Sequence, residues 1–186
     1  PTADVTQQAR EPSEKFAFGR NWSNFLDAVD EPAIESAVDS LRELLQCDSL
    51  QSKRFLDAGS GSGLFSLAAH RLGAEVISFD ADADSVACTN ELRRRSDEPS
   101  SWFVRQGSLL DLDFLSAFEA SDIVYCWGVA HHTGDMWLAL DHLTSLVTPE
   151  GRLVVAIYND EGYVSKLWHA IKRIYQKLPG WLQPVY

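Results

Sequence analysis

The sequence has few cysteines, little positive charge and no long hydrophobic run, and each shortage excludes a class of protein. Three cysteines in 186 residues are too few for a disulfide framework or a CxxC metal site, so we expect reduced thiols and a cytoplasmic location. Sixteen basic against 27 acidic residues give a net charge of −11, which repels a phosphate backbone and excludes nucleic acid as an expected partner. No apolar run reaches the roughly 18 residues of a membrane span, and no signal peptide is recognisable.

Composition changes divide the chain into three predicted parts. Residues 1–15 are polar and without periodicity, which predicts a mobile N-terminal arm. Residues 16–160 are predicted to form one domain with an N-terminal helical cap, and residues 161–186 an amphipathic helical segment. Because the chain begins with Pro1, we expect a processed or trimmed N-terminus.

An aromatic segment and a helix precede the main pattern. Phe18, Trp22 and Phe25 either pack on the edge of the domain or form a lid over a ligand. A helix is predicted from Pro32 to Gln46, because apolar residues follow at helical spacing. These residues are Ile34, Ala37, Val38, Leu41, Leu44 and Leu45.

Beyond residue 53, predicted strands alternate with predicted helices. The strands are expected at 54–58, 75–79, 102–105, 122–127 and 152–158, and the helices at 63–72, 83–95, 135–147 and 162–178. This order predicts a Rossmann-like, doubly wound α/β fold, with a mostly parallel sheet and helices on both faces. Ligands of such sheets bind at the carboxyl ends of the strands.

A glycine turn follows the first predicted strand. Asp57 ends the strand region, and glycines stand at Gly59, Gly61 and Gly63 before the next helix begins. A dinucleotide fingerprint would need its third glycine one position later, where this chain has Leu64.

The spacing from Asp57 to Gly63 resembles motif I of the class I S-adenosylmethionine (SAM)-dependent methyltransferases, D/E-x-G-x-G-x-G. The resemblance implies that the chain binds SAM and releases S-adenosylhomocysteine (SAH). It also implies that the acidic residue forms hydrogen bonds near the methionine amino end, and that the turn packs under the cofactor. The cofactor-binding residues expected there are Asp57, Gly59, Ser60, Gly61 and Gly63.

A second acidic residue, Asp80, ends the next predicted strand, 17 positions after Gly63. A carboxylate at this place can accept hydrogen bonds from both hydroxyls of a ribose, which adenosine supplies in SAM. We therefore assign Asp80, with the adjacent Ala81, to the cofactor. Helix capping is the alternative, but Asp82 and Asp84 are better placed for it.

The segment after the third predicted strand departs from the family pattern. Class I methyltransferases have Gly-Asp there, whose acid meets the adenine amino group and whose next backbone N–H meets the ring. This chain has Gly107-Ser108, followed by Leu109. The resemblance assigns Ser108 and Leu109 to adenine; Asp111 can replace the acid, or either polar residue caps a turn.

The loop after the fourth predicted strand carries Trp127 and two adjacent histidines, His131 and His132. In this fold the loop faces the methyl group of SAM, so Trp127 is assigned to the cofactor. A neutral imidazole can take a proton from an acceptor hydroxyl during methyl transfer. One of the two histidines is the expected base, with a slight preference for His132.

This loop and the segment from Gly151 to Lys166 are similar to the branch that contains the ubiquinone-biosynthesis O-methyltransferases. In that branch a pair of glutamates beside a histidine is associated with a divalent metal. Gly128 and His131 stand at those places here, so no metal is expected and a quinone precursor is not implied as the acceptor.

The end of the sequence combines an apolar stripe with basic residues. The basic residues are Lys166, Lys172, Arg173 and Lys177, and the apolar ones are Val164, Leu167, Trp168, Ile171, Ile174, Tyr175 and Leu178. Residues 164–186 are expected either to pack on the sheet or to touch an anionic membrane or a lipid-like acceptor at its periphery. The antiparallel hairpin that usually ends a class I sheet has no sequence left, so the chain is truncated or closes its sheet differently.

The sequence thus predicts methyl transfer from SAM to a small or lipid-like acceptor, at oxygen. The alternative is a non-catalytic SAM-binding sensor or interaction domain. Oligomeric state cannot be inferred from these patterns.

Overall fold

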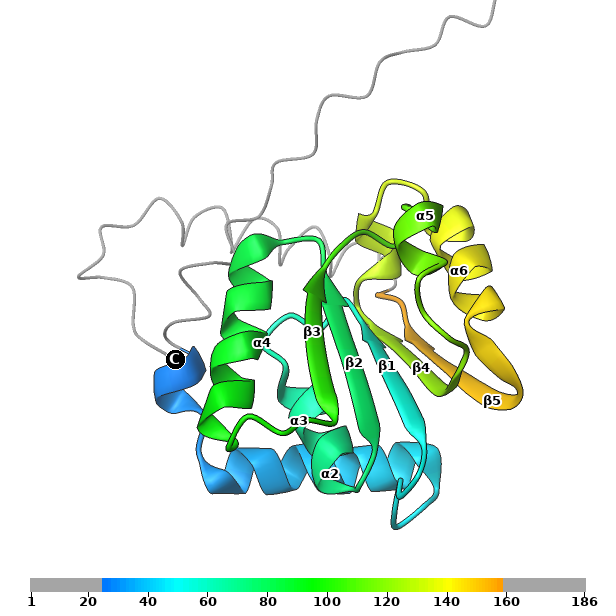
Figure 1. The fold of residues 1–186 in the computed structure, drawn as a ribbon. Helices are drawn as coiled ribbons and strands as arrows, with labels where there is room; N and C mark the ends of the chain where they lie inside the picture. The colour runs from blue at the N-terminus through cyan, green and yellow to red at the C-terminus, as the bar shows by residue number, and fades with distance from the viewer. Residues whose placement is uncertain (1–24, 159–186) are drawn as a thin grey trace, which may run out of the picture.

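A five-stranded sheet forms the centre of the protein in a computed structural model that describes residues 25–158 (Figure 1). The strands are β1 (Arg54–Ala58), β2 (Glu75–Asp80), β3 (Trp102–Gln106), β4 (Ser121–Trp127) and β5 (Val147–Ala156). Their order in the sheet is β3-β2-β1-β4-β5, and every pairing is parallel. The predicted α/β fold is confirmed for the described part of the chain.

Helices cover both faces of this sheet, as expected from the strand–helix alternation (Figure 1). On one face lie α2 (Glu31–Leu45), α3 (Leu64–Arg71) and α4 (Ala83–Arg95); on the other lie the short α5 (Leu112–Leu115) and α6 (Met136–Ser145). A single 3₁₀ turn, η1 (Ala130–His132), follows β4. The carboxyl ends of β1, β2 and β4 meet at one edge of the sheet, where the predicted site lies.

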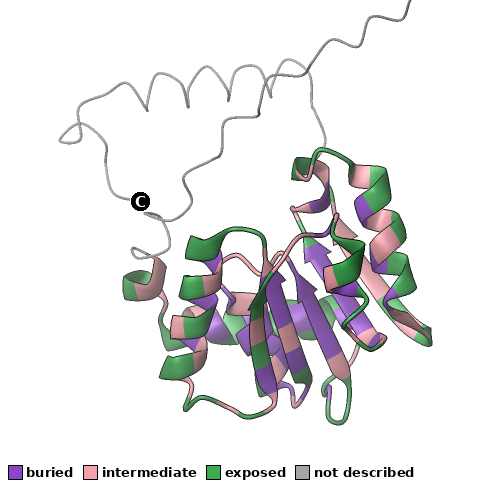
Figure 2. Cartoon of the chain, turned by 45° about the horizontal axis from the view of Figure 1, so that its top comes forward, coloured by how far each residue is buried: buried purple, intermediate pink, exposed green. Residues whose placement is uncertain are grey.

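Two apolar clusters fill the spaces between the sheet and its helices, and Figure 2 shows the buried residues concentrated along the strands. The first cluster joins α2 and α3 to the sheet and includes Leu41, Leu67, Phe55, Val76 and Trp102. The second lies beneath α6 and includes Leu56, Phe79, Val124, Ala139 and Leu143. Burial of aliphatic and aromatic side chains on both faces is what anchors the strand ends that carry the polar residues.

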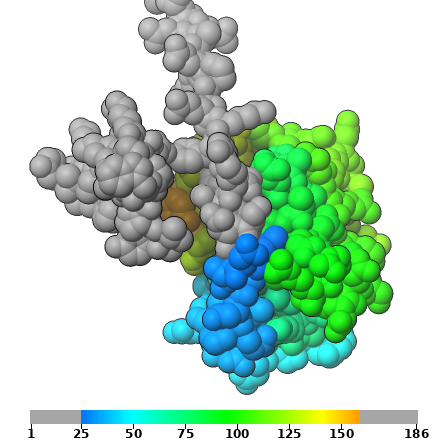
Figure 3. Space-filling view, turned by 90° about the vertical axis from the view of Figure 1, so that its left-hand side faces the viewer, coloured from blue at the N-terminus to red at the C-terminus, as the bar shows by residue number. Residues whose placement is uncertain are grey.

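Helix α2 confirms the helix predicted from residue 32 to residue 46. Asp30 caps it by accepting a hydrogen bond from the Ala33 backbone N–H, and the left-handed Gln46 ends it. All six apolar residues that predicted the helix lie in it, and five are buried, whereas Leu44 is 42% exposed. The α2 side of the molecule is shown in Figure 3, where the blue start of the described chain lies against α4. Arg95 of α4 donates to the Leu26 carbonyl there.

Strand β5 differs most from its predicted bounds. It begins at Val147, not at residue 152, and it ends at Ala156. Its pairing with β4 shifts between Ser121 and Ile123, which pair with Val147 and Arg152, so the residues around Pro149 bulge out of the ladder. The predicted strand at 152–158 left these residues out, whereas β5 includes Pro149 and Gly151 in an irregular part of its pairing.

Several predictions fall outside the described residues: the arm at 1–15, Phe18 and Trp22, the helix at 162–178 and the basic apolar segment at 164–186. Within residues 25–158, none of the helices combines the length and the apolar character needed to cross a bilayer.

Candidate functional site

The glycine turn between β1 and α3 has the backbone conformation that only glycine adopts without strain. Gly59, Gly61 and Gly63 have φ angles of 88°, 54° and 81°. The N–H groups of Gly59 and Ser60 both donate to the Phe79 carbonyl of β2, which fixes the turn beside the end of that strand. Gly63 caps α3 without a side chain, so the first N–H groups of the helix have no side-chain acceptor.

Close packing within the protein also demands these glycines. A Cβ atom on Gly59 would stand 2.6 Å from the Val129 side chain, and one on Gly63 would stand 2.9 Å from Thr89. The first contact joins the glycine turn to the loop after β4, and the second joins it to α4. From the sequence, these glycines were expected to let a ligand approach the backbone closely. In the structure they also let the loop after β4 and helix α4 pack closely against the turn.

Asp57 lies in β1 beneath this turn and is 3% exposed. Its Oδ2 atom accepts a hydrogen bond from the Ser66 hydroxyl at 2.5 Å. Its Oδ1 atom has no hydrogen-bond donor within residues 25–158. Burial raises the pKa of this carboxyl to about 7, aided by the negative charge of Asp80 and opposed by the Ser66 hydrogen bond. A carboxylate oxygen without a donor among residues 25–158 can accept from a cationic or N–H-bearing ligand.

Asp80 ends β2 and holds the glycine turn directly. Its Oδ2 accepts from the Gly61 N–H at 3.0 Å and its Oδ1 from the Asp82 N–H at 2.9 Å. Burial raises the pKa of Asp80, while these backbone hydrogen bonds act in the opposite direction. Each carboxylate oxygen keeps further acceptor capacity for a ribose hydroxyl. Asp82 caps α4 by accepting from Ser85, as its position predicted.

The neighbouring residue Ala81 is exposed, and its carbonyl accepts a hydrogen bond from the Gln106 side chain at 3.2 Å. Gln106 ends β3 and thereby joins the carboxyl ends of two strands. Gln106 was not predicted as a site residue, because a lone glutamine at a strand end belongs to no recognisable motif.

The adenine candidates after β3 take part in local turns. The Ser108 hydroxyl accepts from the Leu110 N–H, and Asp111 caps α5 by accepting from the Phe114 N–H. The structure therefore gives both polar residues the turn and cap roles that were left open. Leu109 is 4% exposed and packs its side chain into the core. Its backbone N–H has no hydrogen-bond partner in the described part of the chain, which suits the expected contact with a base.

The loop after β4 brings the two histidines together with a residue that follows β5. The rings of His131 and His132 are 4.0 Å apart, and Tyr158 meets the His131 ring at 5.1 Å. Both ring nitrogens of His131 are shielded from solvent and have no partner among the described residues, whereas His132 is exposed. Burial lowers the pKa of His131, and the neighbouring His132 lowers it further.

Two more aromatic features complete this edge. Trp127 ends β4, is 44% exposed and stacks on Tyr125 at 5.8 Å between ring centroids. Gly128 has a φ of 73°, and a Cβ atom there would stand 2.6 Å from the Tyr158 hydroxyl. Tyr158 falls within the segment from Gly151 to Lys166 that carried a family resemblance, but no role was predicted for it, so its contact with the histidine loop was missed.

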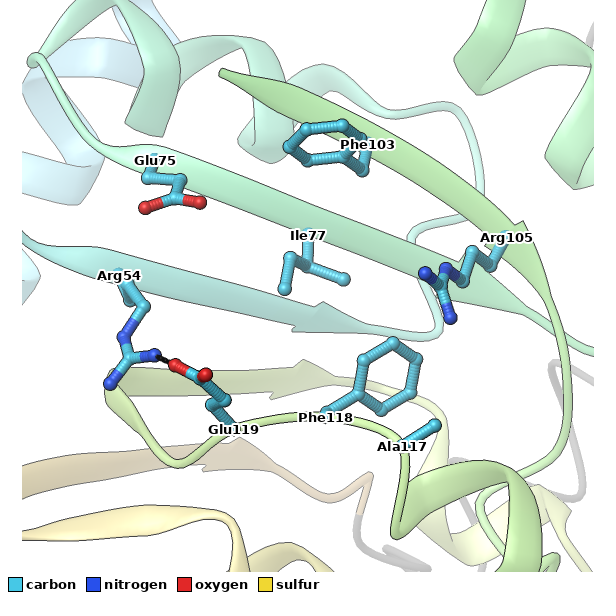
Figure 4. Close-up of a pocket in the computed structure, with 8 residues that line it drawn as sticks. All are labelled: Arg54, Glu75, Ile77, Phe103, Arg105, Ala117, Phe118 and Glu119. Atoms are coloured by element: carbon cyan, nitrogen blue, oxygen red, sulfur yellow. Dashed lines mark hydrogen bonds and ion pairs between the residues drawn. The ribbon is translucent and has the colours of Figure 1, made fainter. Parts of the chain in front are cut away.

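No three His, Cys, Asp or Glu side chains between residues 25 and 158 are arranged to hold a metal ion. A pocket of about 290 Å³ lies elsewhere, on the sheet face opposite α2, α3 and α4 (Figure 4). Its apolar floor includes Ile77 and Phe103, and an Arg54–Glu119 ion pair stands at its rim. This pocket is separate from the glycine turn and its acidic residues.

The family model described as "Methyltransferase domain" matches residues 56–155, from within β1 to within β5, and contains every residue of the site just described except Tyr158. The chain belongs to this family.

Comparisons with individual methyltransferases agree with this assignment, although each match covers only part of the two proteins. The chain is 33% identical over 110 residues to the ubiquinone biosynthesis O-methyltransferase of Rhodopseudomonas palustris, covering 59% of this chain and 42% of that protein. The chain thus spans less than half of the length of this curated relative.

Two solved structures show the same fold. The YcgJ protein of Bacillus subtilis has a TM-score of 0.60 at 22% identity, covering 76% of this chain and 59% of that one. A coclaurine N-methyltransferase bound to N-methylheliamine and SAH has a TM-score of 0.54 at 18% identity, covering 66% of this chain and 35% of that one.

Proposed function

We propose that this chain transfers a methyl group from SAM to a small or lipid-like acceptor, at an oxygen atom. The observation that carries the proposal is the pair Asp57 and Asp80 at adjacent strand ends beneath the glycine turn, with no donor to Asp57 Oδ1 among residues 25–158. Membership of the methyltransferase-domain family supports it. When bound, SAM supplies an activated methyl group on a sulfonium.

Each residue of the site has a defined task in this proposal. Asp57 Oδ1 accepts from the α-amino group of the methionine part, and Asp80 accepts from the ribose hydroxyls. The Leu109 N–H meets the adenine ring. Methyl transfer requires the acceptor oxygen, the methyl carbon and the sulfur to lie in line. These contacts would fix the position of the donor so that an acceptor can meet that requirement.

His131 is proposed as the general base. Its nitrogens have no competing hydrogen-bond partner in the described residues, and its lowered pKa keeps it neutral near pH 7. As the acceptor oxygen attacks the methyl carbon, the oxygen loses its proton to His131 and the carbon–sulfur bond breaks with its electron pair on sulfur. His132 is exposed, so the geometry favours His131 over the sequence preference for His132.

Exposed aromatic rings near the histidines suit an aromatic or lipid-like acceptor. Trp127 is 44% and Tyr158 64% exposed, and both sit at the carboxyl edge of the sheet. Aromatic side chains bind flat apolar groups while leaving the polar end of an acceptor in reach of a base. The name of the Rhodopseudomonas relative, an O-methyltransferase, supports oxygen as the acceptor atom.

Titration calorimetry with SAM and SAH, followed by transfer of a labelled methyl group to phenolic and lipid-extract acceptors, tests the proposal. We expect binding of both and transfer that His131→Ala abolishes. Absence of binding overturns the proposal. Binding without transfer to any acceptor indicates instead the alternative, a SAM-binding sensor or interaction domain.

A further inference from the structure

A chain of buried hydrogen bonds runs through the core to the carboxyl group of Asp57. The Trp102 indole N–H donates to the Ser78 hydroxyl at 2.8 Å, and the Ser78 and Ser66 hydroxyls are 2.7 Å apart. The Ser66 hydroxyl then donates to Asp57 Oδ2 at 2.5 Å. Trp102, Ser78 and Ser66 are all fully buried, and they come from β3, β2 and α3.

The sheet register explains why these residues meet. Ser78 is the direct partner of Asp57 in the β1–β2 ladder, so their side chains share one face. Trp102 of β3 points to the same face and belongs to the core cluster under α3, the helix that carries Ser66. This series of hydrogen bonds therefore forms only when β2, β3 and α3 are in their native positions.

Only one arrangement of protons satisfies every donor in this chain. The indole N–H can only donate, so Ser78 must accept from Trp102 and is left with its own hydrogen to give. Ser66 is the next oxygen in reach, and it passes its hydrogen on to Asp57. The direction is fixed at the tryptophan end, so Asp57 Oδ2 always accepts and Oδ1 is the oxygen left for a ligand or a proton.

We propose that Ser66, Ser78 and Trp102 are positioning residues that hold the Asp57 carboxylate with Oδ1 directed to the α-amino group of the cofactor. This inference rests on the proposed function. Buried polar chains of this kind specify one orientation when every member is satisfied. Without them, the carboxyl has no fixed acceptor geometry. Its neighbours are Asp80 and the Tyr125 hydroxyl, which has no hydrogen-bond partner among residues 25–158.

The affinities of two related ligands distinguish a role of these residues in positioning Asp57 from a role in folding alone. SAH carries the α-amino group, whereas 5′-methylthioadenosine has the adenosine and the thioether without it. Calorimetry on the full chain should show that Ser66→Ala binds SAH about tenfold more weakly, since a charge-assisted contact is misplaced. Binding of 5′-methylthioadenosine should change less than twofold. Ser78→Ala should show the same selectivity to a smaller degree.

Trp102→Phe keeps an aromatic ring in the core and removes the N–H that starts the hydrogen-bond series, together with part of the buried indole volume. It leaves both serines in place and so serves as a second variant. It should reduce SAH affinity severalfold and leave 5′-methylthioadenosine binding unchanged. Ser121→Ala is the matched control. Ser121 is a buried serine of β4, 1% exposed, that takes no part in the series of hydrogen bonds from Trp102 to Asp57. It should alter neither affinity.

The pH dependence of SAH affinity gives a second measurement. The Ser66 hydrogen bond lowers the pKa of Asp57, whereas burial and Asp80 raise it. Ser66→Ala should therefore move the midpoint of the affinity profile to higher pH, while Ser121→Ala leaves it in place. Equal losses for both ligands, or an unmoved midpoint, overturn the positioning role alone. Failure of the wild type to bind either ligand overturns the proposed function, and this inference with it.

Discussion

The ring of Tyr158 meets the ring of His131 edge to face, at 5.1 Å between centroids and 71° between planes. The two residues stand 27 positions apart in sequence and reach each other because they follow neighbouring parallel strands, β4 and β5. Tyr158 also covers Gly128, whose hydrogen atom leaves room for the phenol. The tyrosine ring thus limits the orientations open to the proposed base.

Tyr158→Phe should keep most methyl transfer, because it retains the ring that packs against His131. Tyr158→Ala should lower kcat about tenfold or more, since the imidazole loses the surface that orients it. Steady-state kinetics with the acceptor found by screening measures both. The KM for SAM should stay unchanged in each variant. Equal losses in the two variants would show that the hydroxyl, not the ring, is what matters.

The rate of methyl transfer should fall only at acid pH. His131 acts when neutral, and its lowered pKa keeps it neutral to a pH below the ordinary histidine value of about 6.5. A profile of kcat against pH should therefore have its acid limb below that value. His131→Gln should lose about 10²-fold or more and remove the limb. His132→Gln should retain it; the reverse pattern would assign the base to His132.

The stability of the cofactor-free protein should depend on pH through Asp57. Its pKa rises from 3.8 to about 7 on folding, so its stabilising contribution is complete below about pH 4 and is lost as the pH rises through 7. Asp57→Asn cannot titrate. Between pH 5 and 8 the wild type should therefore lose roughly 2 kcal/mol relative to this variant. Urea unfolding at each pH measures the difference, and parallel curves for the two proteins would contradict it.

Gly59→Ala and Gly134→Ala form a matched pair. Both glycines have positive φ, 88° and 93°, but a Cβ atom meets Val129 at 2.6 Å in the first and nothing within 4 Å in the second. Gly134→Ala should cost about 1 kcal/mol of unfolding free energy from backbone strain alone. Gly59→Ala should cost roughly 1–3 kcal/mol more from overpacking. Thermal melts compare them; Val129→Ala should recover part of the excess, and equal costs would refute the contact.

The sequence was sufficient for features that repeat locally or occupy a motif. The strand bounds of β1 and the helix bounds of α4 match the prediction, and the acidic residues Asp57 and Asp80 lie beside the glycine turn as expected. Both depend on patterns within about 25 residues, which hydrophobic periodicity and glycine spacing record directly.

What the sequence left out depends on contacts between distant segments. Nothing in the run around Ser66 shows that its hydroxyl will meet Ser78 and Asp57, because the register of two strands and the crossing of α3 decide it. The same holds for Tyr158 beside His131. Strand β5 was predicted to begin at residue 152, but it begins at Val147, because pairing with β4 recruits residues that no local pattern marks as a strand.

The contact of Gly59 with Val129 has a thermodynamic consequence for how two ligands influence each other. Because the glycine turn and the loop that leads to His131 are in tight contact at this point, a ligand that displaces one segment acts on the other. Thermodynamic linkage then sets the size of the effect. Any factor by which the donor changes the dissociation constant of the acceptor equals the factor by which the acceptor changes that of the donor.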